Sequence, residues 1–292
     1  MTARALSLHW FLRDIKIVHS VFALPFAASV FTLGLCPLPS ALQVLWLLLA
    51  MVAARSWAMG FNRYFDRDID SLNARTAGRM IPAGHITANE TLVWSLLAGA
   101  LFIMASFALS PLAGVLSLPL LIILALYSKM KHWSYFAHWY LGVCLGLAPI
   151  AVCVAVLGTI PSQALILGLA VSFWTAGFDI LYATQDRDFD RKMSLHSIPA
   201  RWGMRGSWRI AATLFSLMMF LLIGLGVLTH QNSIYQIGMA MIAGLLILQL
   251  WLVSDATENS ASKRLSGTFL NVNASISVCF FLATLVSYLV GR

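Results

Sequence analysis

The sequence predicts an all-α integral membrane protein, a bundle of nine transmembrane helices. Of its 292 residues, 60% are hydrophobic and only 10% are charged, whereas soluble domains average about 25% charged residues. Apolar runs long enough to cross a bilayer, about 18 to 24 residues each, recur nine times. Basic residues gather in the connections on one side of these runs. A water-soluble globular protein is therefore excluded.

Each run is predicted to form one membrane-spanning helix, because such a helix needs about 20 apolar residues. The first run follows Arg4, Arg13 and Lys16, and a basic segment before an apolar run is also typical of a secretory signal peptide. It contains Pro25 and eight further runs follow it, so we expect it to be retained. In chain order, the predicted spans are 17–36, 40–61, 91–109, 112–128, 136–157, 162–184, 208–228, 234–254 and 267–290.

The distribution of charge predicts the orientation of the bundle. The connections without Lys, Arg, Asp or Glu are 34–39, 110–111, 158–162 and 229–233. The connections on the opposite side carry Lys or Arg and should face the cytoplasm. We expect a cytoplasmic amino terminus and an external carboxyl terminus. This asymmetry explains the net charge of +8 without any binding to nucleic acid.

A short internal repeat links two acidic segments. Residues 66–70 read DRDID, and residues 186–190 read DRDFD. Four predicted helices separate the two copies, so both should lie on the same side of the membrane, as a parallel structural repeat requires. We expect a single transmembrane domain, 1–292, built from two pseudo-repeats with acidic motifs near 62–70 and 179–190.

Seven of the eleven acidic residues fall in these two motifs. If the second helix continues past residue 61, then Asn62, Asp66 and Asp70 share one of its faces, because they are spaced by about one helical turn. Asp68 then points elsewhere. The first motif therefore predicts a stripe of oxygen ligands on the second helix.

The second motif predicts a similar stripe on the sixth helix. Asp179, Tyr182, Asp186 and Asp190 follow one another at intervals of three or four residues, and Asp188 lies about half a turn away. Facing carboxylates repel unless a cation lies between them. Hard oxygen ligands suit Mg²⁺, which usually keeps waters and bridges to substrate phosphates. The two stripes therefore predict a site for Mg²⁺ and a diphosphate.

A plainer interpretation of the acidic motifs is also open. The acids could simply pair with Arg63, Arg67, Arg187 and Arg191, which are interleaved with them, and form a solvated loop face. Such pairing does not explain why an Asn and a Tyr lie on the same stripes as the acids.

Both motifs match a known family. Asn62 to Asp70 matches the NxxxDxxxD motif of the UbiA-type intramembrane aromatic prenyltransferases, and Asp179 to Asp190 matches their DxxYxxxDxxxD motif. The resemblance extends to residues 22–27 (FALPFA), to 73–84 (NARTAGRMIPAG), and to Tyr127 and Lys131. It implies a nine-helix bundle around a central cavity that opens toward the membrane. There, a polyprenyl diphosphate ionises and its carbon chain joins an aromatic ring.

The resemblance also implies roles for the motif residues. Two Mg²⁺ ions would stabilise the charge that builds on the departing diphosphate. The implied metal ligands are Asp66, Asp70, Asp186 and Asp190. Asn62 would support the first metal site. Asp179 and Tyr182 would lie deeper, where the carbocation meets the acceptor ring, and a tyrosine face can stabilise a cation.

Several basic residues are candidates for substrate binding. Arg55 lies within a predicted span, where an arginine is a functional candidate, but it could equally be a buried partner of Asp179. The resemblance assigns Lys131 to diphosphate or acceptor binding. His132 follows it where many members have Arg, which grips a carboxylate with two donors. The other substrate-binding candidates are Lys16, His19, Arg63, Arg79 and Lys129.

These features predict Mg²⁺-dependent transfer of a polyprenyl group to an aromatic acid in quinone biosynthesis. Residues 196–201 (HSIPAR) resemble members that prenylate 4-hydroxybenzoate or related naphthoates. 4-Hydroxybenzoate is the leading acceptor, and a naphthoate of menaquinone biosynthesis is the alternative. The expected partners are a polyprenyl diphosphate, the aromatic acid and membrane lipid.

Two other classes of function share some of these features. Intramembrane Arg and Asp can mark the ion path of a transporter, but these acids gather at one end and line no route across. A phosphatidyl transferase uses metals similarly, but its D-x-x-D-G…A-R signature is absent.

The four cysteines form no CxxC pair and are expected to be buried thiols. Close helix approach is expected at Gly142, Gly146, Gly168 and Gly177.

Overall fold

The computed structural model describes residues 3–15, 23–254 and 261–291. The contacts between residues divide the chain into two compact units. Unit 1 is made of the described residues within 3–15, 39–129 and 154–158, and unit 2 of those within 23–38, 130–153 and 159–291. The motif at 62–70 lies in unit 1, and the motif at 179–190 lies in unit 2.

Among the described residues, eight helices are long and apolar enough to cross a membrane. They coincide with eight of the nine predicted spans, and the chain is an all-α integral membrane protein. The other predicted span, 17–36, is represented by the nine-residue helix α2 (Leu24–Thr32), while its residues 17–22 lie outside the described part of the chain. The apolar runs therefore located the helices correctly.

Unit 1 is built around a long helix that carries the first motif. Its helices are α1 (Ala3–Asp14), α3 (Ala41–Leu72), α4 (Ala88–Leu109) and α5 (Pro111–Leu126), followed by the 3₁₀ turn η2 (Tyr127–Lys129). Helix α3 begins at a capping box in which Ser40 accepts from the backbone N–H of Gln43. It continues to Leu72, so the condition under which Asn62, Asp66 and Asp70 share one face is met, although the predicted span ended at residue 61.

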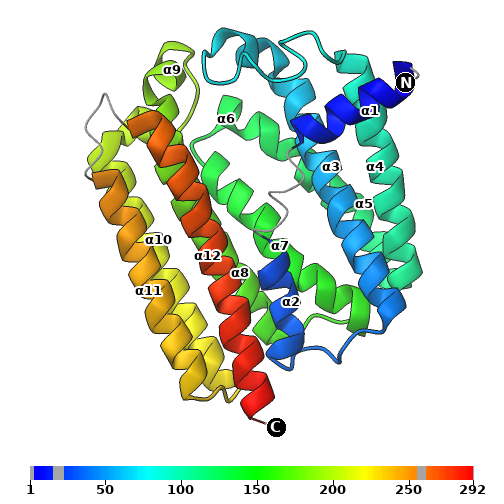
Figure 1. The fold of residues 1–292 in the computed structure, drawn as a ribbon, viewed down its shortest axis with the longest axis vertical. Helices are drawn as coiled ribbons and strands as arrows, with labels where there is room; N and C mark the ends of the chain where they lie inside the picture. Colours follow the sequence, from blue (N-terminus) through cyan, green and yellow to red (C-terminus); the bar gives the residue numbers. More distant parts are fainter. Residues whose placement is uncertain (1–2, 16–22, 255–260, 292) are drawn as a thin grey trace. The chain divides into compact units, whose positions relative to one another are not determined.

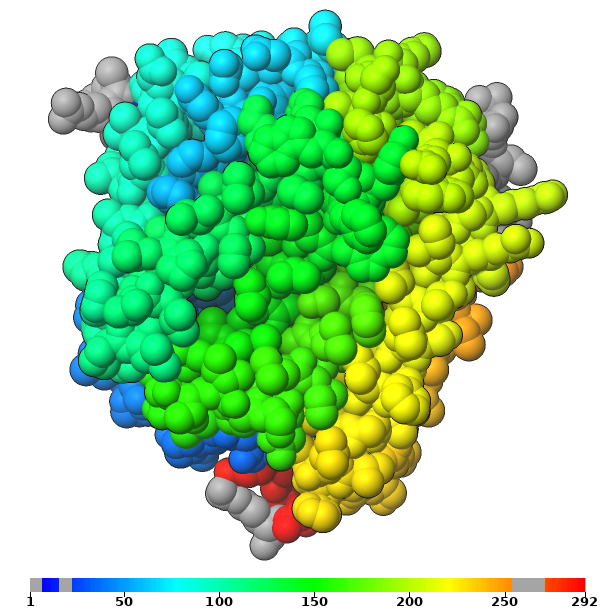
Figure 2. Space-filling view, turned by 180° about the vertical axis from the view of Figure 1, so that it is seen from behind, coloured from blue at the N-terminus to red at the C-terminus, as the bar shows by residue number. Residues whose placement is uncertain are grey.

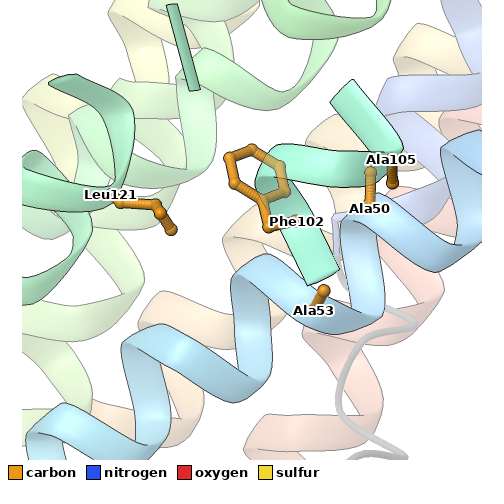
Figure 3. Close-up of a cluster of buried hydrophobic side chains, with 5 residues drawn as sticks. All are labelled: Ala50, Ala53, Phe102, Ala105 and Leu121. Atoms are coloured by element: carbon orange, nitrogen blue, oxygen red, sulfur yellow. The ribbon is translucent and has the colours of Figure 1, made fainter. Parts of the chain in front are cut away.

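Small residues on α3 allow its neighbours to pack closely. Helix α3 lies along α4, and both contact α5 (Figure 1). Ala50 and Ala53 of α3 leave room for Phe102 of α4, and Leu121 of α5 completes this buried cluster (Figure 3). Trp57 adds a hydrogen bond from its indole N–H to the carbonyl oxygen of Leu121, at 2.8 Å. These contacts hold the motif-bearing helix to two neighbours.

The amino-terminal helix α1 packs against the segment that follows the first motif. Phe11 and Ile15 are buried against Ile86. Trp10 stacks on His85, with ring centroids 4.6 Å apart. None of the predicted spans covers this helix, and its packing brings Asp14 next to Arg63 of the first motif.

Unit 2 contains the second motif and the remaining helices. They are α2, α6 (Met130–Trp133), α7 (Ala137–Leu157, of which 154–157 belong to unit 1), α8 (Ser162–Ala183), the 3₁₀ turn η3 (Thr184–Asp186), α9 (Arg187–Lys192), α10 (Ile198–Leu228), α11 (Ser233–Ser254) and α12 (Ala261–Val290). Helix α8 packs on α10, α11 packs on both α10 and α12, and α2 packs on α12. Phe26, Trp174 and Phe280 form an aromatic core among α2, α8 and α12.

Helix α10 turns apolar side chains outward, as a lipid-facing surface requires. Helix α10 exposes Phe220, Ile223 and Val227, and Figure 2 shows part of the surface of this helix in yellow. Near its start, α10 is interrupted at Gly203, whose φ of 65° lies in the left-handed region that glycine adopts readily. The residues before Gly203 therefore form a short separate turn.

Glycines allow the backbones of α7 and α8 to touch, as predicted. A Cβ atom at Gly146 would overlap the carbonyl oxygen of Gly168, and one at Gly142 would overlap that of Ser172.

The cysteines are free thiols, and the Sγ atoms of Cys36 and Cys153 lie 3.1 Å apart in the interior of unit 2.

We expect Gly146→Ala to destabilise the protein by about 1–3 kcal/mol, because the new methyl group overpacks a backbone contact that cannot easily move. Gly224→Ala is the matched control, because a Cβ atom at Gly224 of α10 meets nothing within 4 Å. That control should be neutral or slightly stabilising. Thermal unfolding in one detergent measures both variants, and equal melting temperatures would contradict the close α7–α8 contact.

Candidate functional site

The first motif presents its residues as the helical spacing predicts. Asn62, Asp66 and Asp70 follow one another along α3, and the amide Nδ2 of Asn62 donates to Oδ2 of Asp66 at 2.7 Å. The Asp70 side chain is 8% exposed and accepts from Nη1 of Arg79 with both oxygens. The Asp68 side chain is 84% exposed. The motif thus separates a protected face from a solvent face.

A buried arginine orients the asparagine of this motif. Arg63 donates from Nη1 to Oδ1 of Asn62 at 2.8 Å, which fixes the amide so that its NH₂ group faces Asp66. The Nε atom of Arg63 lies 3.5 Å from Oδ1 of Asp14. The same Oδ1 accepts from the backbone N–H of Met80 at 3.3 Å. A chain of contacts therefore runs from Asp14 through Arg63 and Asn62 to Asp66.

We expect Asp14→Asn to lower the free energy of unfolding by about 1–3 kcal/mol, because it leaves the buried Arg63 guanidinium without its anionic partner. It should also reduce activity, since Arg63 orients Asn62. The control is Asp68→Asn, which changes an exposed aspartate in the same unit and should leave both quantities near wild type. Thermal unfolding and turnover measure the two effects. A wild-type melting temperature for Asp14→Asn would show that the contact between Asp14 and Arg63 does not stabilise the fold.

The second motif departs from one continuous stripe. Helix α8 carries Asp179 and Tyr182, but it ends at Ala183, and the chain tightens into η3 before α9 begins. The Thr184 hydroxyl donates back to the carbonyl oxygen of Leu181 at 2.6 Å, a local bond that competes with the helical pattern. The predicted stripe from Asp179 to Asp190 therefore runs over three consecutive segments rather than over one helix.

From the end of this turn onward, the second motif also exposes its central aspartate. Asp186 and Asp190 are buried, at 7% and 2% exposure, whereas the Asp188 side chain is 73% exposed. In each motif, the arginine before the exposed aspartate pairs with it: Arg67 with Asp68 at 3.7 Å and Arg187 with Asp188 at 3.1 Å. The alternative interpretation, in which the acids pair with interleaved arginines, therefore holds for the exposed Asp68 and Asp188.

The loop after α9 folds back around Asp190. Its backbone N–H groups at Leu195 and His196 donate to the carbonyl oxygens of Asp190 and Lys131, each at 2.8 Å. The positive charge of Lys131 and the hydroxyl of Ser197 both act on the Asp190 carboxylate. The segment 196–201 (HSIPAR) therefore lies beside an acid of the second motif.

Asp179 has a partner, His138, that no sequence pattern indicates. Oδ2 of Asp179 lies 2.6 Å from Nδ1 of His138, near the start of α7. His138 is completely buried. It stands 41 residues before Asp179, so no helical periodicity connects the two in the sequence.

The other predicted substrate-binding residues are distributed over both units. In unit 1, Arg55 lies on α3 with the charge of Arg63 and the Tyr127 side chain nearby. Lys129 places its Nζ atom 4.6 Å from the centroid of the Phe65 ring. In unit 2, Lys131 and His132 lie on α6. Lys16 and His19 lie outside the described residues.

The side chains present fit a magnesium ion that keeps part of its water shell. Within neither unit do three His, Cys, Asp or Glu side chains of the described residues form a group that could hold a metal alone. Oδ2 of Asp190 is buried and has no hydrogen-bond donor among those residues, and such an atom is costly unless a cation approaches it. Carboxylate oxygens in small numbers, completed by waters and phosphates, are what Mg²⁺ accepts.

Comparison with known proteins agrees with this arrangement. Residues 22–275 match the model of the UbiA prenyltransferase family. A 4-hydroxybenzoate octaprenyltransferase from Aliivibrio fischeri is 31% identical over 229 residues, 77% of each chain. One from Tolumonas auensis is 30% identical over 219 residues, 75% of each chain.

Solved structures have the same fold. A UbiA homologue from Aeropyrum pernix superposes with a TM-score of 0.82 at 28% identity, covering 92% of this chain and 98% of its own. A homologue from Archaeoglobus fulgidus bound to DMAPP and Mg²⁺ gives a TM-score of 0.73 at 19% identity, covering 94% of this chain and 99% of its own.

Proposed function

The chain belongs to the UbiA prenyltransferase family, and on this premise we propose that it transfers a polyprenyl group from polyprenyl diphosphate to the ring of 4-hydroxybenzoate, with Mg²⁺ as the required metal. One observation carries the proposal: each acidic motif turns its central aspartate to solvent, whereas the flanking aspartates are less exposed, with Asp70, Asp186 and Asp190 buried and Asp66 half-buried. The names of relatives at 30–31% identity support the acceptor. Family membership makes the chain a prenyltransferase rather than a transporter.

The diphosphate is assigned to the residues of the two motifs. The proposed Mg²⁺ ligands are Asp66, Asp70, Asp186 and Asp190. Bound Mg²⁺ would neutralise the charge that builds on the leaving diphosphate. Lys131, whose charge already acts on Asp190, and Arg79, which contacts Asp70, are proposed to bind diphosphate oxygens. Arg63 is instead assigned to orienting Asn62, because it is buried against Asp14.

The chemistry proposed is an electrophilic substitution on the ring. The bond between the allylic carbon and the diphosphate oxygen breaks, and the bonding electrons leave with the diphosphate. The ring carbon beside the hydroxyl group then forms the new carbon–carbon bond, and the proton on that carbon is lost. We assign acceptance of this proton to the Asp179 carboxylate, and stabilisation of the cation to the ring of Tyr182.

The carboxylate of the aromatic acid needs positively charged or hydrogen-bonding partners. We assign its binding to Arg55 and His132. Lys129, three residues before His132 in the sequence, is a further candidate. Lys16 and His19 stay predictions from the sequence. The orientation is likewise proposed from the charge of the connections: acidic motifs and amino terminus in the cytoplasm, carboxyl terminus outside, in a bacterial inner membrane.

The proposed function is tested with purified protein in lipid vesicles that contain Mg²⁺ and a labelled polyprenyl diphosphate. 4-Hydroxybenzoate and a dihydroxynaphthoate are offered separately and together, and the products are weighed by mass spectrometry. We expect prenylated hydroxybenzoate, with kcat/KM at least about tenfold above that for the naphthoate. A preference for the naphthoate would move the acceptor to the menaquinone alternative. No product from either acid would overturn the proposal.

A further inference from the structure

His138 makes two hydrogen bonds that together connect separate parts of unit 2. Its Nδ1 lies 2.6 Å from Oδ2 of Asp179 on α8. Its Nε2 lies 3.3 Å from the backbone nitrogen of Ile198, the first residue of α10. The imidazole is completely buried, whereas the Asp179 side chain is 22% exposed. The histidine therefore holds an accessible carboxylate from its buried side.

The backbone contact determines which nitrogen carries the proton. The Ile198 N–H can only donate, so Nε2 must accept, and the hydrogen of the neutral ring is on Nδ1. A hydrogen on Nε2 would point at another N–H group. Nδ1–H therefore donates to Asp179, and one carboxylate oxygen is fixed while the other stays available.

The Ile198 N–H group belongs to a helix terminus that needs an acceptor. The first backbone N–H groups of a helix have no partner within it. In α10, the Ser197 hydroxyl accepts from Ala200 at 3.3 Å, and His138 accepts from Ile198. Because residues 190–197 fold back from Asp190 to this point, His138 links the orientation of Asp179 to the loop beside the second motif.

We propose that His138 is a positioning residue for Asp179: it holds the carboxylate so that its free oxygen faces the reacting ring carbon. This inference rests on the proposed function, because it deepens the role assigned to Asp179. A purely structural histidine would serve the helix terminus alone. The two roles use different nitrogens of the ring, so they can be separated by substitution.

Two substitutions, His138→Asn and His138→Gln, separate the positioning role from the structural role. In His138→Asn, the side-chain NH₂ group takes the place of Nδ1 and can still donate to Asp179, while the contact with Ile198 is lost. In His138→Gln, the longer side chain reaches the place of Nε2 and can still accept from Ile198, while Asp179 loses its donor. Both variants are neutral and polar, so a difference between them reports on the position of the hydrogen bond.

We expect His138→Gln to lower kcat by about 10²-fold, the usual consequence of misplacing a reacting group by about 1 Å. Its KM for the polyprenyl diphosphate should stay near wild type. His138→Asn should keep most of kcat. In an Asp179→Asn background, His138→Gln should cost nothing more, since it acts through Asp179. Equal losses of kcat in both amide variants, or an undiminished effect of His138→Gln in that background, would overturn the proposal.

A second readout does not depend on turnover. Nitrogen-15 NMR of histidine-labelled protein in nanodiscs should show the His138 ring protonated on Nδ1 alone, and its signal should shift in Asp179→Asn. A ring protonated on Nε2 would overturn the positioning role whatever the enzyme does. Absence of any prenylated acid with wild-type protein would instead overturn the proposed function. The two failures are therefore distinguishable.

Discussion

Asp66→Asn and Asp186→Asn are each expected to reduce prenyl transfer by about 10²-fold or more. Each variant removes one charged oxygen ligand from the proposed diphosphate site, and losing one electrostatic contact to a developing charge typically costs that much. One of these aspartates lies in unit 1 and the other in unit 2, so equal damage from both would show that each motif contributes. Turnover of labelled polyprenyl diphosphate measures the loss.

The chain contains its own controls for this experiment. Asp68→Asn and Asp188→Asn make the same chemical change two residues further along each motif, at side chains that are 84% and 73% exposed and pair with Arg67 and Arg187. These variants should keep activity close to wild type. If either control were as damaging as Asp66→Asn in a correctly inserted protein, the assignment of metal ligands would be wrong.

Removal of divalent metal is expected to abolish turnover completely. Without a cation, the carboxylates of the two motifs would repel the diphosphate, and the leaving group would depart without neutralisation. Dialysis against EDTA followed by the vesicle assay measures this, and added Mg²⁺ should restore the rate. A melting temperature unchanged by EDTA would show that the protein remains folded. Full turnover in excess EDTA would contradict the metal requirement.

The membrane helices could be predicted because the apolar runs needed to cross lipid are long and continuous. The face of α3 that carries Asn62, Asp66 and Asp70 could also be predicted, because the helix is regular to Leu72. The spacing correctly separated Asp68 and Asp188 from the protected acids. In these cases, local periodicity determines where a side chain points.

The remaining features depend on contacts between residues far apart in the chain. His138 meets Asp179, and Asp14 meets Arg63, through packing that leaves no spacing signal in the sequence. Arg63 was predicted to bind substrate, but its burial against Asp14, 49 residues earlier in the chain, could not be predicted. The 3₁₀ turn that begins at Thr184 interrupts the helical spacing, and residue patterns do not reveal it.

The central proposal is that the aspartates of each motif contribute to Mg²⁺-dependent binding of a prenyl diphosphate. Binding of a non-hydrolysable prenyl thiolodiphosphate, measured by calorimetry in detergent with and without Mg²⁺, tests it most directly because no acceptor or turnover is involved. We predict binding by the wild type only with Mg²⁺, severe weakening in both Asp66→Asn and Asp186→Asn, and little change in Asp68→Asn and Asp188→Asn. Equal affinity without metal, or wild-type affinity in Asp66→Asn or Asp186→Asn, would contradict the claim.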